Sequence, residues 1–243
     1  MKNGCILWEG PSQFDPTVTI GAIMVYHSDN RKTGNIPQVY IMRKDVNPCV
    51  TLRDGRDQAV CGNCPLRAKP YGCGACYVAV NRGPSVAWKQ WTAGLYESRD
   101  VLPDRRQELP YTVRVGAYGD PLAVPFHVWN ALAKLFPVLL GYTHSWKDYP
   151  SHAKRWMASC HTQEDIELAN SRGLSTFTAL SQGGEVPIGS FSCLYSKQDT
   201  INCANCRLCF GASTRTRNVF IDVHGPANKV TAYKRMAKEK GWL

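Results

Sequence analysis

The sequence predicts an α/β protein with one barrel-like domain. The chain has 243 residues, which is enough to bury a full single core. From residue 85 onward, short apolar strands alternate with amphipathic helices in units of roughly 20 to 35 residues, which is typical of parallel strands joined by right-handed crossovers. No internal repeat or long linker divides the chain. We therefore expect a single-domain β/α barrel-like sheet, one form of which is an incomplete TIM barrel.

The expected elements follow in chain order. Two runs rich in β-branched and aromatic residues, 17–28 and 38–44, predict a β-hairpin because Gly, Asn and Pro bound them. Residues 47–84 are rich in cysteine and turn-forming residues and predict a metal-binding insertion. The β/α core spans 85–192, with helices expected over 86–96, 124–136 and 162–173 and strands over 111–118, 137–144, 155–160 and 174–180. The remainder, 193–243, holds a cysteine-rich knuckle and a basic C-terminal helix, within a single domain over 1–243.

Composition narrows the class of protein. Hydrophobic residues make up 44% and charged residues 20% of the chain, and no apolar run is long enough to span a membrane. The start of the chain has no signal segment, so we expect a cytoplasmic protein whose eleven cysteines are thiols and not a disulfide framework.

The charge is basic and uneven. The formal net charge is +10, and residues 228–243 carry five lysines and arginines against Glu239 alone. Such a field favours a polyanion, and nucleic acid is the natural partner. The alternative is a solvated helix face that only keeps the protein in solution. The candidate nucleic-acid contacts are Arg215, Arg217, Lys234, Arg235 and Lys238.

Cysteine spacing points to metal. One group comprises Cys61, Cys64, Cys73 and Cys76, and a second comprises Cys193, Cys203, Cys206 and Cys209. Thiolates two residues apart can share an ion on one tight loop, as in zinc and iron–sulfur sites. The C-x2-C-x2-C spacing of the second group is used by 4Fe-4S sites; we predict zinc there, with a 4Fe-4S cluster as the alternative. The first group, two separated pairs, favours zinc or a cluster equally. Cys49 is a substitute ligand, and Cys5 and Cys160 are expected to be plain buried thiols.

Polar residues follow several expected strands. They are Gly119-Asp120-Pro121, then Thr143-His144-Ser145-Trp146, Ser159-Cys160-His161 and Ser181-Gln182. Ligand sites form at the carboxyl ends of parallel strands, so these residues predict a shared site. Each alone is also a common cap or turn residue.

Several longer segments carry a family resemblance. CGNCPLR, CYVAVNRGPSVAWKQW, VRVGAYGDPLAVPFHVW, GYTHSW, WMASCHT and the terminal C-x9-C-x2-C-x2-C-x-G followed by DVHG resemble a family of proteins from tailed phages and mobile elements. That family is similar to phage 7-deazaguanine DNA transglycosylases and to queuine tRNA-ribosyltransferases, which have a β/α barrel and a zinc site near the C-terminus. The resemblance implies a transferase in the cytoplasm of an infected bacterium that exchanges guanine in DNA for a 7-deazaguanine base such as preQ0.

Residue roles follow from that implied reaction. A glycosyl transfer needs a carboxylate to trap or stabilise an oxocarbenium-like state, and Asp120 is the best-placed one. His144 would handle protons, and Asp222 is a further catalytic candidate. The expected substrate-binding residues, some of which would stack the base, are Tyr118, Gly119, Tyr142, Trp146 and Ser159. In the transglycosylases, however, the knuckle is C-x-C-x2-C and the nucleophilic aspartate lies close to it, so assigning Asp120 as nucleophile is a hypothesis.

Two other functions remain open. The first is an iron–sulfur, radical-type enzyme that modifies nucleic acid, with the earlier cysteines at the mouth of a half-barrel. The second is a non-enzymatic, metal-stabilised module that binds DNA or RNA. The sequence does not distinguish a DNA substrate from an RNA substrate. It also leaves open which base is modified and what the oligomeric state is.

Overall fold

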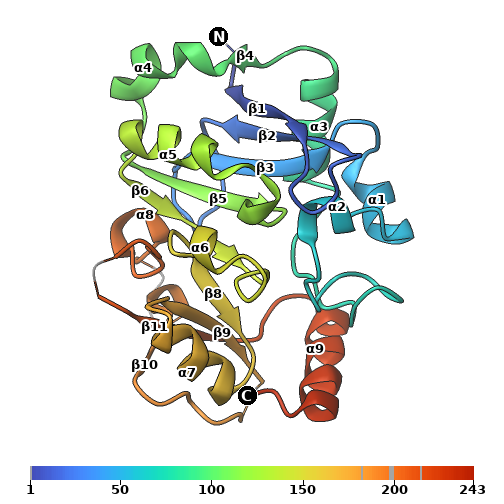
Figure 1. The fold of residues 1–243 in the computed structure, drawn as a ribbon, viewed down its shortest axis with the longest axis vertical. Coiled ribbons are helices and arrows are strands. Elements are labelled where there is room, and N and C mark those ends of the chain that lie inside the picture. Colours follow the sequence, from blue (N-terminus) through green and yellow to red (C-terminus); the bar gives the residue numbers. More distant parts are fainter. Residues whose placement is uncertain (1, 182, 197–199, 214) are drawn as a thin grey trace.

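The computed structural model describes residues 2–181, 183–196, 200–213 and 215–243 and shows an α/β fold with two sheets (Figure 1). The six-stranded sheet has the order β4-β1-β2-β3-β5-β6, and the five-stranded sheet has the order β10-β11-β9-β8-β7. The α/β class predicted from the sequence is confirmed.

The strands and helices have the following bounds. The strands are β1 (Gly4–Pro11), β2 (Thr19–Val25), β3 (Gln38–Arg43), β4 (Glu97–Ser98), β5 (Thr112–Tyr118), β6 (Val138–Leu140), β7 (Tyr142–Thr143), β8 (Met157–Cys160), β9 (Thr176–Leu180), β10 (Ser190–Ser192) and β11 (Asn218–Asp222). The helices are α1 (Pro48–Asp54), α2 (Gln58–Cys61), α3 (Gly83–Thr92), α4 (Leu102–Arg105), α5 (Phe126–Leu135), α6 (Pro150–Ala153), α7 (Gln163–Ser171), α8 (Cys203–Cys206) and α9 (Ala227–Lys240).

The N-terminal half of the first sheet is antiparallel. β2 and β3 form the predicted hairpin, with Ile20 opposite Arg43 and Val25 opposite Gln38. β1 adds to β2 on the other side, and the sequence prediction had no strand there, because Gly4, Gly10 and Pro11 make this segment resemble a turn. From β3 to β5 and β6 the pairing becomes parallel, as the strand–helix alternation predicts.

All pairs of the second sheet are parallel, and its last strand in sequence, β11, is an inner strand between β9 and β10. The predicted strand over 137–144 is divided into β6, which pairs with β5, and β7, which pairs with β8. The division falls at Gly141, where a Cβ would stand 2.7 Å from the Trp156 ring. The bend at Gly141 thus carries the chain from one sheet to the other.

The barrel part of the prediction is not confirmed. Among the described strands, no pairing joins the first sheet to the second, so the strands form two open sheets and barrel closure is not shown. The physical reason lies partly in β1 and β2, whose antiparallel pairing ends the parallel series at β3.

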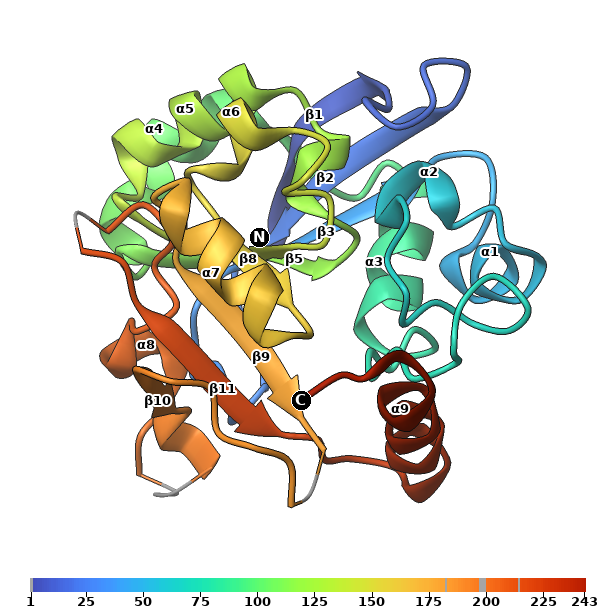
Figure 2. The same cartoon turned by 60° about the horizontal axis from the view of Figure 1, so that its bottom comes forward.

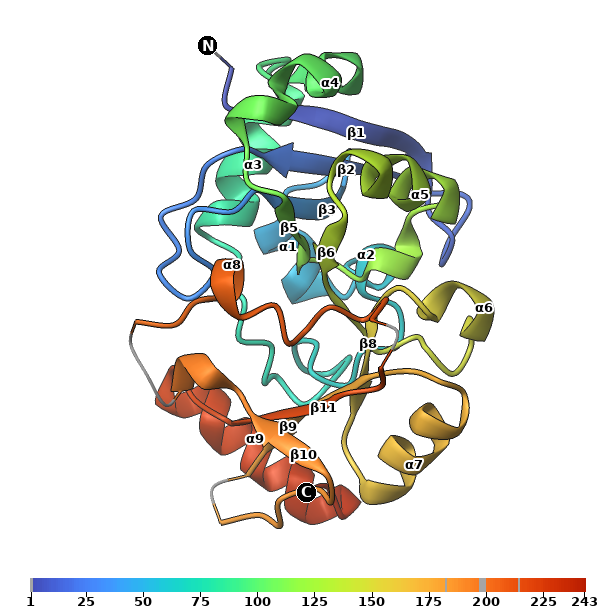
Figure 3. The same cartoon turned by 90° about the vertical axis from the view of Figure 1, so that its left-hand side faces the viewer.

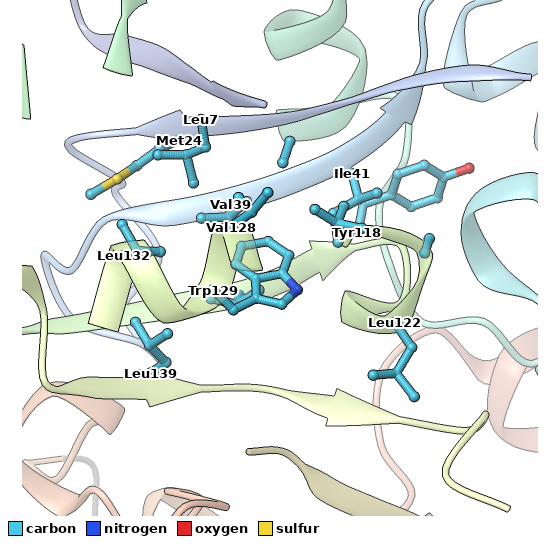
Figure 4. Close-up of a cluster of buried hydrophobic side chains, with 14 of the residues drawn as sticks. Leu7, Met24, Val39, Ile41, Tyr118, Leu122, Val128, Trp129, Leu132 and Leu139 are labelled. Carbon is cyan, nitrogen blue, oxygen red and sulfur yellow. The ribbon is translucent and has the colours of Figure 1, made fainter. Parts of the chain in front are cut away.

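The main core lies between the first sheet and the helices that cover it. Figure 4 shows Trp129 of α5 lying between side chains of the sheet. Its ring meets that of Trp156 edge to face at a centroid distance of 5.6 Å, and both residues are fully buried. Replacing such a tryptophan with alanine costs about 3 to 5 kcal/mol. The labelled core side chains are Leu7, Met24, Val39, Ile41, Tyr118, Leu122, Val128, Trp129, Leu132 and Leu139.

Residues 47–84 contain more regular structure than predicted. Asn47 caps α1 by accepting a hydrogen bond from the N–H of Cys49 (2.9 Å), and Gly55 ends the helix with a left-handed φ of 82°. These caps allow a short helix in a segment whose composition favours turns. Cys61 ends α2, and the other cysteines of this group lie in the loop that follows; we call residues 61–76 the cysteine loop.

The C-terminal helix α9 packs against the cysteine loop, and Figure 2 shows it beside the carboxyl ends of β9 and β11. Lys229 donates a hydrogen bond to the Gly74 carbonyl (3.1 Å), and the Tyr233 hydroxyl donates one to the Ala179 carbonyl. The chain then turns back, and the N–H of Leu243 bonds the His161 carbonyl (2.9 Å). None of the described helices is long and apolar enough to cross a membrane.

Candidate functional site

A cavity of about 180 Å³ lies at the carboxyl ends of the parallel strands. Its walls come from β5, β7, β8, β9 and β11, from the cysteine loop and from α9. Six residues predicted from the sequence line it, namely Tyr118, Gly119, Asp120, Tyr142, His144 and Ser159. Parallel pairing places these strand ends at one edge. The predicted gathering of polar residues is confirmed, whereas their chemical roles stay predictions.

Asp120 is both a cap and a cavity residue. One carboxylate oxygen accepts the N–H of Leu122 (2.9 Å), and the other accepts the Thr143 hydroxyl (2.9 Å) and the N–H of His144 (3.0 Å). Burial raises the pKa of Asp120 to about 6, although these hydrogen bonds oppose the shift. The preceding Gly119 has φ 82° and would bring a Cβ to 2.7 Å from the Ile41 carbonyl oxygen, so this turn requires glycine. Through these hydrogen bonds, Asp120 therefore links the end of β5 to the end of β7 and the loop that follows it.

Two imidazoles stack at the cavity wall. The rings of His144 and His161 lie 5.4 Å apart, and His161 stacks on Trp242 at 4.0 Å. Burial lowers the pKa of His144 to about 3 and that of His161 to about 4, so both are uncharged near neutral pH. A neutral His144 is a poor proton carrier for the predicted reaction. Both ring nitrogens of the buried His161 lack a hydrogen-bond partner.

Three cysteines of the first group face the cavity. Cys61, Cys64 and Cys76 line it, and we call them the cavity thiols. Burial raises the pKa of Cys61, and the nearby charges of Asp57, Cys64 and Cys76 raise it further. Burial also raises the pKa values of Cys64 and Cys76, whereas backbone N–H groups that bond their sulfurs oppose it. Such N–H groups at the sulfur atoms are a common means of tuning metal–thiolate sites.

Cys73 is not part of this set. It is buried in a separate cluster with Ala75 and with Tyr233 and Ala237 of α9. In this structure Cys73 thus contacts α9 while three thiols of the group face the cavity, and the prediction of four ligands stays a prediction.

A buried ion pair holds the cysteine loop in place. Arg67 bonds the Asp57 carboxylate through Nε (2.9 Å) and Nη2 (2.6 Å), and neither side chain is more than 7% exposed. Arg67 also bonds the carbonyls of Gly55 and Gly62, which flank α2. The pair thus fixes the turn that presents the cavity thiols.

The C-terminal cysteine group lies on another side of the site. Cys193, Cys203, Cys206 and Cys209 all line a separate cavity of about 30 Å³, beside Tyr142 and Phe177. The N–H of Cys203 bonds the Lys32 carbonyl (3.0 Å), so the loop between β2 and β3 supports α8 (Figure 3). The N–H of Cys193 bonds the Phe220 carbonyl of β11 (2.7 Å). All four predicted members of this group come together.

Cations stand beside the C-terminal cysteine group. Burial lowers the pKa of Lys32, and the nearby Cys193, Cys203 and Cys209 oppose that shift. The guanidinium of Arg114 stacks on the Tyr142 ring at 4.1 Å from the carbon Cζ to the ring centroid. Burial raises the pKa of Cys209 to about 12, and a hydrogen bond with Tyr142 opposes it.

As the side chains stand, no group of three or more His, Cys, Asp or Glu residues within the described segments is arranged to hold a metal ion. Zinc and iron–sulfur binding therefore remain predictions for both cysteine groups. Cys5 and Cys160 are buried thiols as predicted, and Cys49 lies away from the cavity, at the start of α1.

Two predicted site residues lie elsewhere. Trp146 is fully buried in the core, where its Nε1 donates to the Ser159 carbonyl (3.1 Å), so it cannot stack a base. Asp222 is exposed at the end of β11 and does not line the cavity. Trp146 and Asp222 were chosen for their positions in the sequence. The direction of each side chain decides whether it reaches the cavity. Gln182 lies outside the described residues.

The basic residues come from two segments of the chain. Arg215 and Arg217 precede β11, whereas Lys234, Arg235 and Lys238 lie on α9, which follows it. Arg235 also pairs with Glu239 at 3.8 Å. The prediction of nucleic-acid contacts by these residues stays untested.

Sequence reasoning missed several cavity residues. Arg114 lies between Val113 and Val115 in a buried strand, and a lone arginine in such a run was the available signal. Tyr77 follows Cys76 and is 60% exposed at the cavity. Lys32 carried no signal beyond its place in a turn, whereas His161 was among the polar residues expected after a strand but was given no role.

Comparisons with protein-family models, with curated proteins and with solved structures give no match to this chain. The functional argument therefore depends on the site itself.

Proposed function

We propose that the protein is an iron–sulfur enzyme that modifies nucleic acid, with a cluster held by the cavity thiols. The observation that carries the proposal is that Cys61, Cys64 and Cys76 line the same cavity as Asp120 and the strand ends. Cys61, Cys64 and Cys76 would hold such a cluster, and a cluster with three protein ligands would keep one iron free of protein ligands. The cluster supplies electrons when it is bound, and the cavity holds the substrate beside it.

The environment of the thiols supports this proposal. Backbone N–H groups at the sulfurs of Cys64 and Cys76 favour the thiolate form that a metal needs. The Arg67–Asp57 pair holds the loop rigid, which suits a site whose geometry must be kept. In the same proposal the four-thiol C-terminal cysteine group holds zinc or a second cluster, and the partner is DNA or RNA.

The test is the metal content of matched variants purified without oxygen. Cys61→Ser, Cys64→Ser and Cys76→Ser are each expected to lose the iron and sulfide that wild type holds at the cavity. Cys73→Ser is the matched control, because it removes a thiol of the same loop that does not face the cavity.

Two results would contradict the iron–sulfur proposal. One is a colourless wild-type protein, after reconstitution with iron and sulfide, that holds only zinc. The other is equal loss of iron in Cys73→Ser and Cys61→Ser, which would contradict a cluster held by the three cavity thiols alone.

A second candidate function is the exchange of guanine for a 7-deazaguanine such as preQ0. The observation that favours it is the carboxylate of Asp120 in the cavity with a pKa of about 6. Its three hydrogen bonds leave it less free to attack a sugar than the mechanism requires, which is why this function ranks second.

Incorporation of labelled preQ0 into DNA or tRNA tests that candidate. If wild type incorporates label and Asp120→Asn folds but loses at least a hundredfold in rate, the exchange function is supported. Without incorporation under conditions where nucleic acid binds, it is excluded.

A further inference from the structure

Arg114 is a buried cation that has no carboxylate partner. It is 9% exposed and lines the cavity, and no carboxylate in the described parts of the chain lies within ion-pair distance of it. Its closest companions are the rings of Tyr142 and Tyr77 and the thiol of Cys203. Because a buried charge is costly without a counter-charge, this site needs either an ionised thiolate such as that of Cys203 or an anion from outside the chain.

Lys32 faces the same part of the cavity. Its Nζ lies 3.3 Å from Nε2 of His224, and Nδ1 of that histidine lies 2.8 Å from the Asp222 carbonyl. Since a carbonyl only accepts, Nδ1 carries the proton and Nε2 accepts from the lysine. His224 thus orients the ammonium group, whose other two N–H donors remain for a ligand. Lys229 adds a third cation to the lining, against the single carboxylate of Asp120.

The same cavity offers groups suited to a flat, polar ring. His161 is 9% exposed, uncharged near neutral pH and without a partner at either ring nitrogen, so it presents one donor and one acceptor. The Tyr77 ring is 60% exposed at the cavity, where a planar ligand can stack on it. A nucleotide is a ligand that combines an anionic group with a flat, hydrogen-bonding ring.

We propose that this cavity binds a nucleotide whose phosphate lies between Arg114 and Lys32 and whose base is bound by His161 and Tyr77. This proposal rests on the proposed function in one respect: the bound nucleotide would be the one that the enzyme modifies. The nucleotide is either free or part of a nucleic-acid strand, since both offer the same phosphate and base. Neither the phosphate site nor the base site includes a cavity thiol, so nucleotide binding and cluster content can be measured separately.

The experiment compares calorimetric titrations of guanosine 5′-monophosphate, guanosine and a short single-stranded DNA into the protein as purified. We expect the monophosphate to bind more tightly than the nucleoside, and Arg114→Gln and Lys32→Gln each to weaken the monophosphate at least tenfold while leaving the nucleoside unchanged. Lys134→Gln is the matched control, because Lys134 is exposed on α5 and does not line the cavity. His161→Phe is expected to weaken the nucleoside as well.

The titrations distinguish a free nucleotide from a nucleotide within a strand, and they also define the results that would overturn the proposal. Tight binding of the oligonucleotide alone, still weakened by Arg114→Gln, supports a nucleotide within a strand. Equal affinity for guanosine and its monophosphate, or no effect of Arg114→Gln on any ligand, overturns the proposal. It is also overturned if Arg114→Gln lowers the metal content and leaves nucleotide affinity unchanged, because the cation would then serve the thiolates. Nucleotide binding that persists in Cys61→Ser while the cluster is lost shows that the two proposals stand or fall separately.

Discussion

The two cysteine groups differ in what surrounds them. The cavity thiols face the larger cavity and have Asp57 and Asp120 as charged neighbours, which raise the pKa values of Cys61 and Cys64. The C-terminal cysteine group surrounds a small cavity and has Lys32 and Arg114 beside it, which lower the pKa of Cys203 against the raising effect of burial. Metal sites that are enclosed by four protein ligands are usually structural, whereas catalytic sites keep one position open. Under the proposal that both groups bind metal, the first group would serve chemistry and the second stability.

The largest expected effect is on stability. If the C-terminal cysteine group holds the proposed metal, replacing Cys203 and Cys209 together with serine should remove it and lower the free energy of unfolding by several kcal/mol, because structural metal binding contributes directly to folding. Chelation of wild type should act in the same direction. Thermal unfolding followed by circular dichroism measures both.

Cys61→Ser is the control for that comparison. A cluster at an open catalytic site contributes less to folding, so this variant should unfold much closer to wild type. Equal destabilisation by the two changes would break the distinction between the groups.

Next in size is the anchor of the cysteine loop. Arg67→Met leaves Asp57 as an unpaired buried charge, which costs about 3 kcal/mol. Arg56→Met removes an exposed pair with Asp54 and should cost no more than about 1 kcal/mol. Urea denaturation measures both variants. Similar losses of unfolding free energy in Arg67→Met and Arg56→Met would mean that the buried pair does not hold the cysteine loop.

A smaller effect concerns pH. Burial raises the pKa of Asp120 in the folded protein from 3.8 to about 6. Because the folded state then holds its proton more tightly, this residue's contribution to stability is complete below pH 4 and is lost as pH rises through about 6. Wild type should therefore lose stability over that interval relative to Asp120→Asn, as measured by urea midpoints at pH 4 and pH 7. A variant that shows the same fall as wild type would assign the effect to other groups.

The smallest effect is on thiol reactivity. In metal-free protein, Lys32→Gln should raise the pKa of Cys203 and slow its alkylation by iodoacetamide severalfold, because a nearby positive charge is removed. Mass spectrometry of the modified peptides gives the rate, and Lys134→Gln serves as the control. An unchanged rate would show that Lys32 does not set the charge environment of this group.

The sequence predicted much of the framework correctly. Strong periodicity in 111–118, 162–173 and 174–180 corresponds to β5, α7 and β9, because burial of one face imposes that pattern. The gathering of Asp120 and His144 at one edge followed from parallel pairing alone. Each of these inferences depends only on local pattern and on a general rule of topology.

Other features depend on long-range packing that spacing does not record. Cys73 has the spacing of a ligand, yet α9 draws it into an apolar cluster. Trp146 follows a strand as Asp120 does, yet its side chain faces the core. The break at Gly141 is imposed by the ring of Trp156, fifteen residues later in the sequence. Contacts between distant segments thus decide which residues of a recognisable motif reach the site.

The inner position of β11 has a consequence for biosynthesis. This strand is the last of the described strands along the chain, yet it separates β9 from β10, so the second sheet cannot be completed until residue 222 has left the ribosome. Until then β10 lacks its neighbouring strand, and the cavity lacks the wall that β11 forms. Folding that waits for such non-local parallel pairing is slow. Expression at low temperature should therefore raise the yield of intact protein more than any change to the first sheet.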